Sequence, residues 1–66
     1  MSGSEAIRSL SRRELCAFLY FKKGFSNAYV AEKMGIQIST VKEYKTNILK
    51  KLSVSNLSEM IEKYGD

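Results

Sequence analysis

The sequence predicts a small all-α domain of four helices that contains a helix-turn-helix. Three observations carry this prediction. Apolar residues recur at intervals of three and four along several segments, which is the period of an amphipathic helix. No segment alternates apolar and polar residues in the manner of a half-buried strand. Serine, asparagine and glycine stand where helices would begin and end, and proline is absent.

The first predicted helix covers residues 12–22 and is bounded by capping residues at both ends. The stretch "SRRE" places Ser11 three residues before Glu14, which is the spacing of a reciprocal capping box. Gly24 follows the basic last turn and supplies a left-handed residue that ends the helix. Residues 1–9 precede these signals, so we expect a flexible N-terminal segment ahead of one domain over residues 10–66.

The second and third predicted helices are close enough together to form a helix-turn-helix. Ser26 caps the two-turn helix "NAYVAEKM", which stops at Gly35. The third helix runs over about residues 38–52, and Gln37 is a weak cap for it. The two helices are joined by three or four residues that include a glycine, which is the spacing of this motif. Short helical corners of this kind also occur in proteins that bind nothing.

The third helix is amphipathic. At 100° per residue one side carries the apolar residues Val41, Tyr44, Ile48 and Leu52, with Ile38 and Leu49 on its shoulder. The opposite side carries Ser39, Glu43, Thr46 and Lys50, flanked by Lys42, Thr40, Asn47 and Lys51. A merely solvated face would mix acids with bases, whereas here lysines outnumber glutamate, and the serine, threonine and asparagine suit phosphates and base edges.

The last predicted helix covers about residues 56–64, with Asn56 and Glu59 offering a second capping box. Its apolar residues stand at i, i+3, i+4 and i+7 and form a candidate seam for a second copy: Leu57, Met60, Ile61 and Tyr64. At least Met60 or Ile61 is expected to face the core of the monomer instead.

Composition narrows the classes of function. The 66 residues carry a net charge of +4, and residues 22–51 hold seven lysines against Glu32 and Glu43, which suits a polyanion. With no histidine and a single cysteine, we expect no metal, no cofactor and no catalysis, and we expect Cys16 to be a buried, inert thiol. No apolar run approaches the roughly 18 residues of a membrane span, so the expected location is the cytoplasm.

Several short motifs occur in a familiar order. "LSRRE" at residues 10–14, "GFSN" at 24–27, "TVK" at 40–42 and "KLSV" at 51–54 resemble the LuxR-type helix-turn-helix of quorum-sensing regulators, NarL/FixJ response regulators and GerE. The resemblance implies bacterial transcription regulation. It also implies that the third helix enters the major groove of double-stranded DNA, that the second abuts the DNA backbone, and that the last helix helps a homodimer form on DNA.

The resemblance also places residues at the DNA. Lys42, Glu43 and Thr46 occupy positions that reach the groove, while Thr40 and the start of the second helix lie near phosphates. Lys51 is expected near phosphates too. Together with the polar side described above, the predicted DNA-binding residues are Ser26, Asn27, Ser39, Thr40, Lys42, Glu43, Lys45, Thr46, Asn47 and Lys50.

Departures from the family pattern leave a second interpretation open. Ala28-Tyr29 stands where relatives usually have Lys-Glu, and Leu15, Cys16 and Leu19 are apolar where relatives are often polar. The chain could therefore be a protein-interaction module of the same fold that pairs with another regulator through the last helix or the Leu15/Leu19 surface. The resemblance leaves two arrangements open: a regulatory domain precedes this module in a longer protein, as in most relatives, or the module stands alone, as GerE does.

Overall fold

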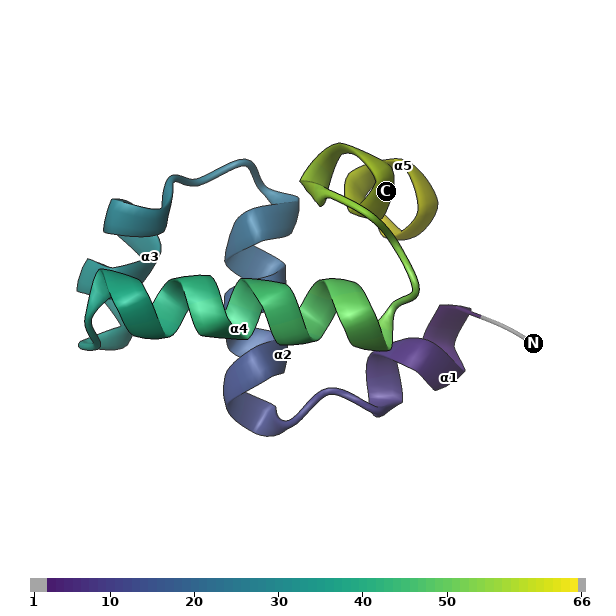
Figure 1. The fold of residues 1–66 in the computed structure, drawn as a ribbon, viewed down its shortest axis with the longest axis horizontal. Coiled ribbons are helices and arrows are strands. Elements are labelled where there is room, and N and C mark those ends of the chain that lie inside the picture. The colour runs from purple at the N-terminus through teal and green to yellow at the C-terminus, as the bar shows by residue number, and fades with distance from the viewer. Residues whose placement is uncertain (1–2, 66) are drawn as a thin grey trace.

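The computed structural model describes residues 3–65, which form helices joined by short turns (Figure 1). The described residues contain no strand, so the predicted all-α class is confirmed. The four predicted helices correspond to α2 to α5, and the helix-turn-helix corresponds to α3 and α4. The bounds are α1 Gly3–Arg8, α2 Arg12–Lys22, α3 Asn27–Met34, α4 Ile38–Lys51 and α5 Leu57–Tyr64.

Helix α1 is the main departure from the predicted elements. The sequence offered no capping signal before residue 11, and residues 1–9 were expected to be flexible. Instead, residues 3–8 are helical, Ala6 and Ile7 pack against the core, and Leu10 behind them is buried. A helix over residues 3–8 was not among the predicted elements, whereas the flexibility of residues 1–9 stays a prediction, and residues 1 and 2 lie outside the described part of the chain.

The ends of α2 and α3 follow the predicted caps. The Ser11 hydroxyl accepts a hydrogen bond from the Glu14 amide at 3.1 Å, and the Glu14 carboxylate accepts one from the Ser11 amide at 2.9 Å, which completes the capping box. Ser26 accepts from the amide of Tyr29 at 3.1 Å. Gly24 and Gly35 have φ of 87° and 67°, a left-handed conformation in which any other residue would be strained.

The ends of α4 and α5 differ from expectation in detail. Gln37 makes no side-chain capping bond, as its identity predicted, and α4 ends at Lys51, one residue early. The Asn56 side chain accepts a hydrogen bond from the Glu59 amide at 2.8 Å. The Glu59 carboxylate accepts from the amide of Ser55 and not from that of Asn56, as a capping box would require. Half of the predicted second capping box is therefore present.

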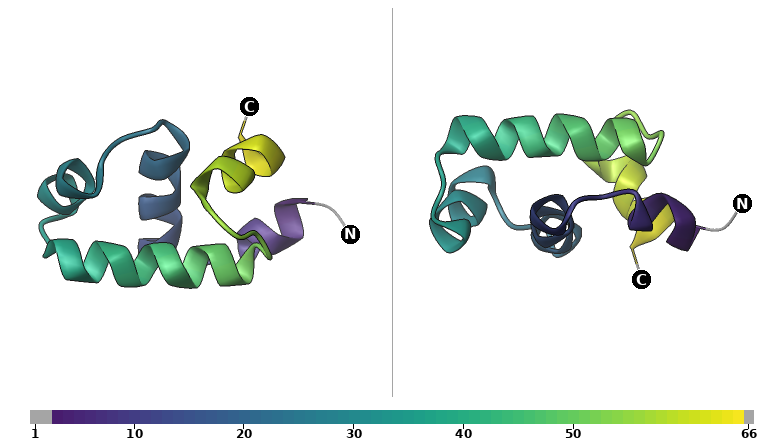
Figure 2. Two further views of the ribbon diagram at one scale, coloured as in Figure 1. Left: turned by 45° about the horizontal axis from the view of Figure 1, so that its top comes forward. Right: turned by 90° about the horizontal axis from the view of Figure 1, so that it is seen from below.

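The longest helix, α4, crosses α2 and α3 and spans most of the length of the molecule (Figures 1 and 2). Helix α5 packs against α2 on the other side of the crossing. Between these helices lies one core, whose largest fully buried side chains are Phe18, Phe21, Val30, Val41, Ile48, Leu52 and Met60. No helix among the described residues has both the length and the apolar character that crossing a membrane requires.

A polar tie fixes the C-terminal end of α4 against the start of α2. Glu14 is the one charged residue buried among those described, with 6% of its surface exposed. The Lys51 ammonium donates to the Glu14 carboxylate at 2.8 Å and to the Ser9 carbonyl at 3.3 Å. The hydrogen bond from Lys51, reinforced by the Ser11 amide, holds the pKa of Glu14 below its ordinary value of 4.5.

Candidate nucleic-acid interface

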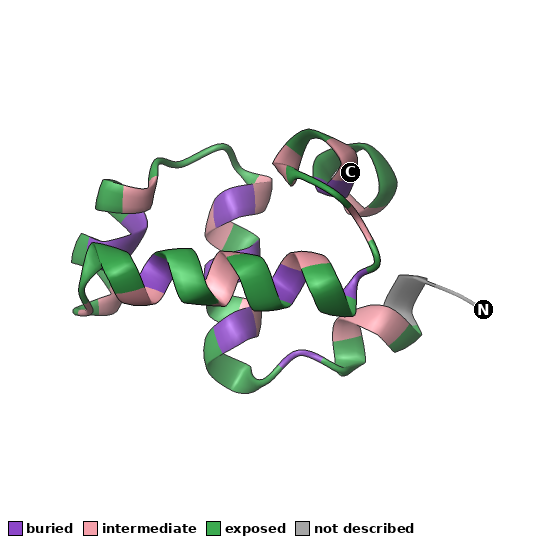
Figure 3. Ribbon diagram, viewed as in Figure 1, coloured by how far each residue is buried: buried purple, intermediate pink, exposed green. Residues whose placement is uncertain are grey.

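The residues on the outer face of α4 are polar, and no other helix lies over this face, much of which is exposed (Figure 3). Helix α4 buries Val41, Ile48 and the following Leu52 against α2 and α3, so the residues on the opposite side point into solvent. Of the residues predicted for this face, Thr40 is half-buried and the others are exposed, namely Ser39, Lys42, Glu43, Thr46, Asn47 and Lys50. The predicted division of α4 into an apolar and a polar side is confirmed. One shoulder residue departs from it, because Ile38 is 45% exposed at the start of the helix.

Four of these residues line a shallow hollow in the middle of the face: Lys42, Glu43, Thr46 and Asn47. The Thr46 hydroxyl donates to the Lys42 carbonyl one turn earlier, at 3.1 Å, so its oxygen keeps a lone pair for accepting. The hollow therefore offers an ammonium donor, a carboxylate acceptor, a hydroxyl acceptor and an amide that does both. This mixture matches the donors and acceptors that base pairs display in the major groove.

Two lysines of α4 are held away from this face. The ammonium of Lys45 lies 5.9 Å from the centre of the Phe21 ring, and the side chain is half-buried. Lys51 is bound to Glu14, as described above. Both lysines were predicted to lie near phosphates, and that contact stays a prediction. Their long aliphatic stems run along the protein surface before the charge is reached, as lysine stems often do.

Ser26 and Asn27 lie on a different helix from the other predicted DNA-binding residues. They stand at the start of α3, where the Ser26 hydroxyl caps the helix and Asn27 is half-buried. A cap accepts through its oxygen, so the hydroxyl hydrogen of Ser26 stays available to a phosphate. Their contact with phosphates stays a prediction.

The predicted dimer seam on α5 is only partly accessible. Met60 is fully buried, so its assignment to an interface is wrong and it belongs to the core. Leu57 and Tyr64 are half-buried against the core, and the Tyr64 hydroxyl donates to the Leu52 carbonyl at 3.1 Å. Ile61 remains, with 39% of its surface exposed. The two adjacent residues therefore differ in environment: Met60 points into the core, and Ile61 points towards solvent.

An exposed aromatic cluster joins α2 to α3 and was not predicted from the sequence. Phe25 and Tyr29 are stacked with ring centres 4.3 Å apart, and Tyr20 meets both rings edge-on. The Lys33 ammonium lies 5.4 Å from the centre of the Tyr29 ring. The available signal was the close spacing of Tyr20, Phe25 and Tyr29 along the chain. The cluster gives Tyr29 a packing role.

The thiol of Cys16 also departs from expectation. It is exposed on the outer side of α2, where a buried and inert thiol was predicted. The apolar run "LCAFLYF" suggested a buried segment, but only Ala17, Phe18 and Phe21 of that run are buried. A helix buries one side only, so an apolar residue on its outer side remains exposed.

Comparison with known proteins supports the arrangement. The family model described as "Bacterial regulatory proteins, luxR family" matches residues 8–64. The chain is 36% identical over 61 residues to the oxygen regulatory protein NreC of Staphylococcus carnosus, and 39% identical over 61 residues to BvgA of Bordetella pertussis, which is named as a transcription regulator of virulence factors. Each alignment covers 92% of this chain but only 28% or 29% of the relative. No solved structure gives a significant match.

Proposed function

The chain belongs to the LuxR family of bacterial regulatory proteins, and we propose that it binds specific double-stranded DNA through α4 as part of a transcription regulator. One observation carries this proposal: the face of α4 that the core leaves open holds lysine, threonine, asparagine and glutamate side chains around a shallow hollow. This face is long, convex and polar, which is the shape and chemistry that a major groove accepts.

The proposed mechanism divides the work between base edges and phosphates. Lys42, Thr46 and Asn47 contact base edges, while Lys50 neutralises a phosphate. The polar side chains at the start of α3 are uncharged and donate hydrogen bonds to phosphates. Glu43 decides specificity at one position. Its negative charge is repelled by the backbone unless the carboxylate accepts a hydrogen bond from a cytosine amino group, so only one kind of base pair compensates for its presence.

Replacing Glu43 with alanine tests this mechanism. We expect Glu43→Ala to reduce the preference for one base pair about tenfold, because the substitution removes the selective acceptor. Binding to unrelated duplexes should become stronger, because a charge that repels phosphates is also removed. The measurement is the selection of bound sequences from random duplexes, followed by titration of the winners. Glu62→Ala is the matched control, since Glu62 is equally acidic and exposed but lies on α5.

Two results would contradict the proposal. An unchanged selection profile for Glu43→Ala would show that Glu43 does not contribute to base recognition. Wild-type binding to duplex DNA that does not weaken with salt would show that the lysines of α4 do not contact phosphates. The logarithm of the association constant should fall with log salt at a slope of about −0.9 per neutralised phosphate. With about three to five phosphates neutralised per monomer, the slope should be roughly −3 to −4.5.

We also propose that two copies bind neighbouring half-sites as a homodimer, with Ile61 and the accessible edge of Leu57 at the seam. Ile61→Asp is expected to abolish cooperative binding to paired half-sites about one helical turn apart, because a carboxylate would be buried in an apolar contact. The measurement compares one-site and two-site duplexes. Lys63→Asp, at an exposed neighbouring position of α5, is the control. Ile61→Asp with full cooperativity would place the seam elsewhere.

The second candidate function is a module that regulates by pairing with another protein. The exposure of Leu19, 48% on the outer side of α2, favours it. The two functions make opposite predictions for the isolated chain. Salt-sensitive binding to duplex DNA at micromolar protein supports the first, whereas tight binding to a regulator with no affinity for DNA supports the second. A regulatory domain ahead of this module stays a prediction.

A further inference from the structure

The outer side of α2 carries a stripe that neither the core nor the proposed DNA contact uses. At 100° per residue the residues at i, i+4, i+7 and i+11 point directly away from the buried Ala17, Phe18 and Phe21. These four residues are exposed: Arg12, Cys16, Leu19 and Lys23. Leu19 is the most exposed large apolar side chain among the described residues. The stripe thus places an apolar centre between two cationic ends.

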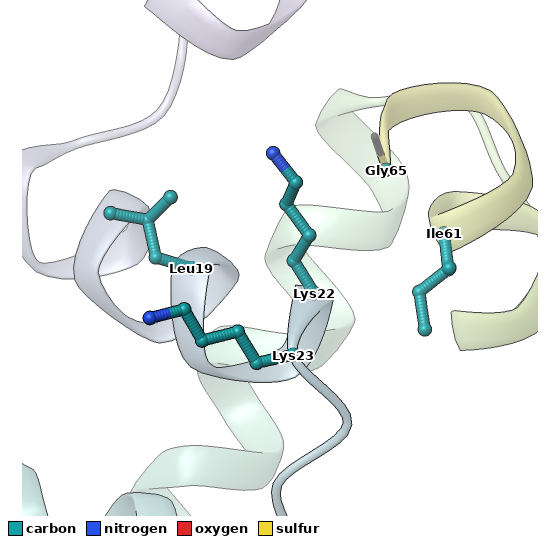
Figure 4. A pocket seen from close by; sticks show the side chains of 5 residues that line it. All are labelled: Leu19, Lys22, Lys23, Ile61 and Gly65. Carbon is teal, nitrogen blue, oxygen red and sulfur yellow. The ribbon is translucent and has the colours of Figure 1, made fainter.

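The surface around this stripe is hollowed on both sides of Leu19. One hollow is lined by Cys16, Leu19, Tyr20 and Lys23, and the other by Leu19, Lys22, Lys23, Ile61 and Gly65. Figure 4 shows the second hollow, in which Lys22 rises between α2 and α5 while Leu19 and Ile61 lie on either side of it. Because the two hollows share Leu19 and Lys23, they adjoin each other and together extend from the middle of α2 to α5. We refer to them together as the α2 groove.

The positive charge of the α2 groove limits which kinds of molecule can bind there. None of the described residues that line it is acidic, and Lys23 makes no salt bridge with any described residue. A second copy docked on the same surface would place cationic side chains against cationic side chains, because the lining of each copy carries lysines and no described acidic residue. Duplex DNA is a poor occupant, because the apolar side chains of Leu19 and Ile61 lie on either side of Lys22 and offer no hydrogen bond to a phosphate backbone.

The position of the α2 groove separates it from α4. Helix α4 lies along one side of the molecule and α2 lies beneath it, as the right-hand view of Figure 2 shows. The stripe points away from the buried side of α2, against which α4 packs. A partner in the α2 groove would therefore leave the outer face of α4 open to DNA.

We propose that the α2 groove docks an acidic amphipathic helix of a partner protein. Apolar side chains of that helix cover Leu19 and Ile61, and its flanking carboxylates meet Lys23 and Arg12. This arrangement is the helix-in-groove mode of peptide recognition, in which residues at i, i+4 and i+7 anchor the apolar contact and the rim charges set the choice of partner. The domain then joins DNA on one side to an acidic protein on the other, and because Ile61 also belongs to the proposed dimer seam, the partner helix and a second copy compete for this residue.

A designed peptide provides the probe. It is a helical peptide with leucine at i, i+4 and i+7 and glutamate on both flanks, compared with a second peptide in which every glutamate is lysine. We expect the glutamate peptide to bind the whole domain and the lysine peptide not to bind, with amide shifts in the nuclear magnetic resonance spectrum around Leu19, Lys23 and Ile61. Lys23→Glu and Leu19→Asn should each weaken binding about tenfold. Lys33→Glu, an equal change of charge on exposed α3, should leave it unchanged.

Several results would overturn the proposal. Equal binding of the two peptides would show that charge does not select the partner, and shifts confined to α4 would place the contact on the DNA face. Self-association of the free domain that Leu19→Asn abolishes would make a second copy the occupant. Binding to phosphatidylglycerol vesicles that Lys23→Glu abolishes, without binding of the glutamate peptide, would make it a lipid surface. DNA affinity measured on Leu19→Asn should equal that of the wild type.

Discussion

Met60→Ala is expected to lower the free energy of unfolding by about 2–4 kcal/mol. Met60 is fully buried and anchors α5 against α2, so its truncation removes apolar contacts and leaves a cavity that the short helix cannot fill. The measurement is urea unfolding followed by circular dichroism. Ile61→Ala is the matched control on the next residue of the same helix, and its cost should stay below about 1 kcal/mol because Ile61 is 39% exposed.

The size of this effect separates a core role from an interface role. A small domain is stable by only about 5–15 kcal/mol, so such a loss would visibly lower the midpoint of unfolding in the monomer. A residue at a dimer seam would instead leave monomer stability unchanged and weaken association. Equal costs for the two alanine variants, or an effect of Met60→Ala only on cooperative DNA binding, would contradict the burial of Met60.

The elements that the sequence predicted correctly are those set by local chemistry. Ser11 and Glu14 satisfy each other's amides across three residues, and Gly24 and Gly35 adopt conformations that other residues avoid. Such signals act within one turn and need no knowledge of the remainder of the fold. Helix α1 lacks them, since it is stabilised by contacts of Ala6 and Ile7 with a core that forms elsewhere in the chain.

The orientation of side chains within a helix was predictable only where the core side was unambiguous. In α4 the buried Val41 and Ile48, with Leu52 directly after the helix, fix the direction, so the opposite polar face follows from the period of the helix. In α5 four apolar residues surround too wide an arc, and only packing decides that Met60 turns inward while Ile61 turns outward. The same ambiguity in α2 led to the wrong prediction that Cys16 is buried, and it left the exposure of Leu19 undecided.

Contacts between residues far apart in the chain could not be predicted from the sequence. Lys51 was expected at phosphates because it belongs to a basic helix, but 37 positions separate it from Glu14, which binds it. No local rule pairs these two residues. The pairing matters for the DNA-binding face, because it fixes the end of α4 to the start of α2 and so contributes to the orientation of the whole outer face of α4.

Glu14→Gln is expected to lower the free energy of unfolding by about 2 kcal/mol at neutral pH. Glutamine keeps an oxygen for the Ser11 amide but loses the charge that attracts Lys51, and its amide hydrogens can be directed at the ammonium. The cost stays moderate because the Lys51 side chain is 41% exposed and can return to water. Urea unfolding at a series of pH values measures the effect, with Glu43→Gln on the exposed face of α4 as the control.

The stabilisation that charged Glu14 provides should decrease as the pH falls. Because the Lys51 hydrogen bond and the Ser11 amide lower the pKa of Glu14 in the folded state, the unfolded chain binds a proton more readily. The stabilisation is therefore complete above the ordinary pKa of 4.5, begins to fade as the pH falls towards that value, and is lost once the pH has fallen through the lowered folded pKa. The difference between wild type and Glu14→Gln should shrink over that window, whereas a constant difference would contradict a charged tie.

The same tie predicts how Lys51 behaves towards DNA. If its ammonium is held by Glu14 and the Ser9 carbonyl, then Lys51→Met should destabilise the fold without reducing the number of phosphates neutralised, so the slope of log K against log salt should equal that of the wild type. Lys50→Met, one residue earlier on the exposed side, should reduce the slope by about 0.9 and leave stability nearly unchanged. A reduced slope for Lys51→Met would show that this lysine leaves Glu14 for a phosphate, and the tie would then be a feature of the free protein alone.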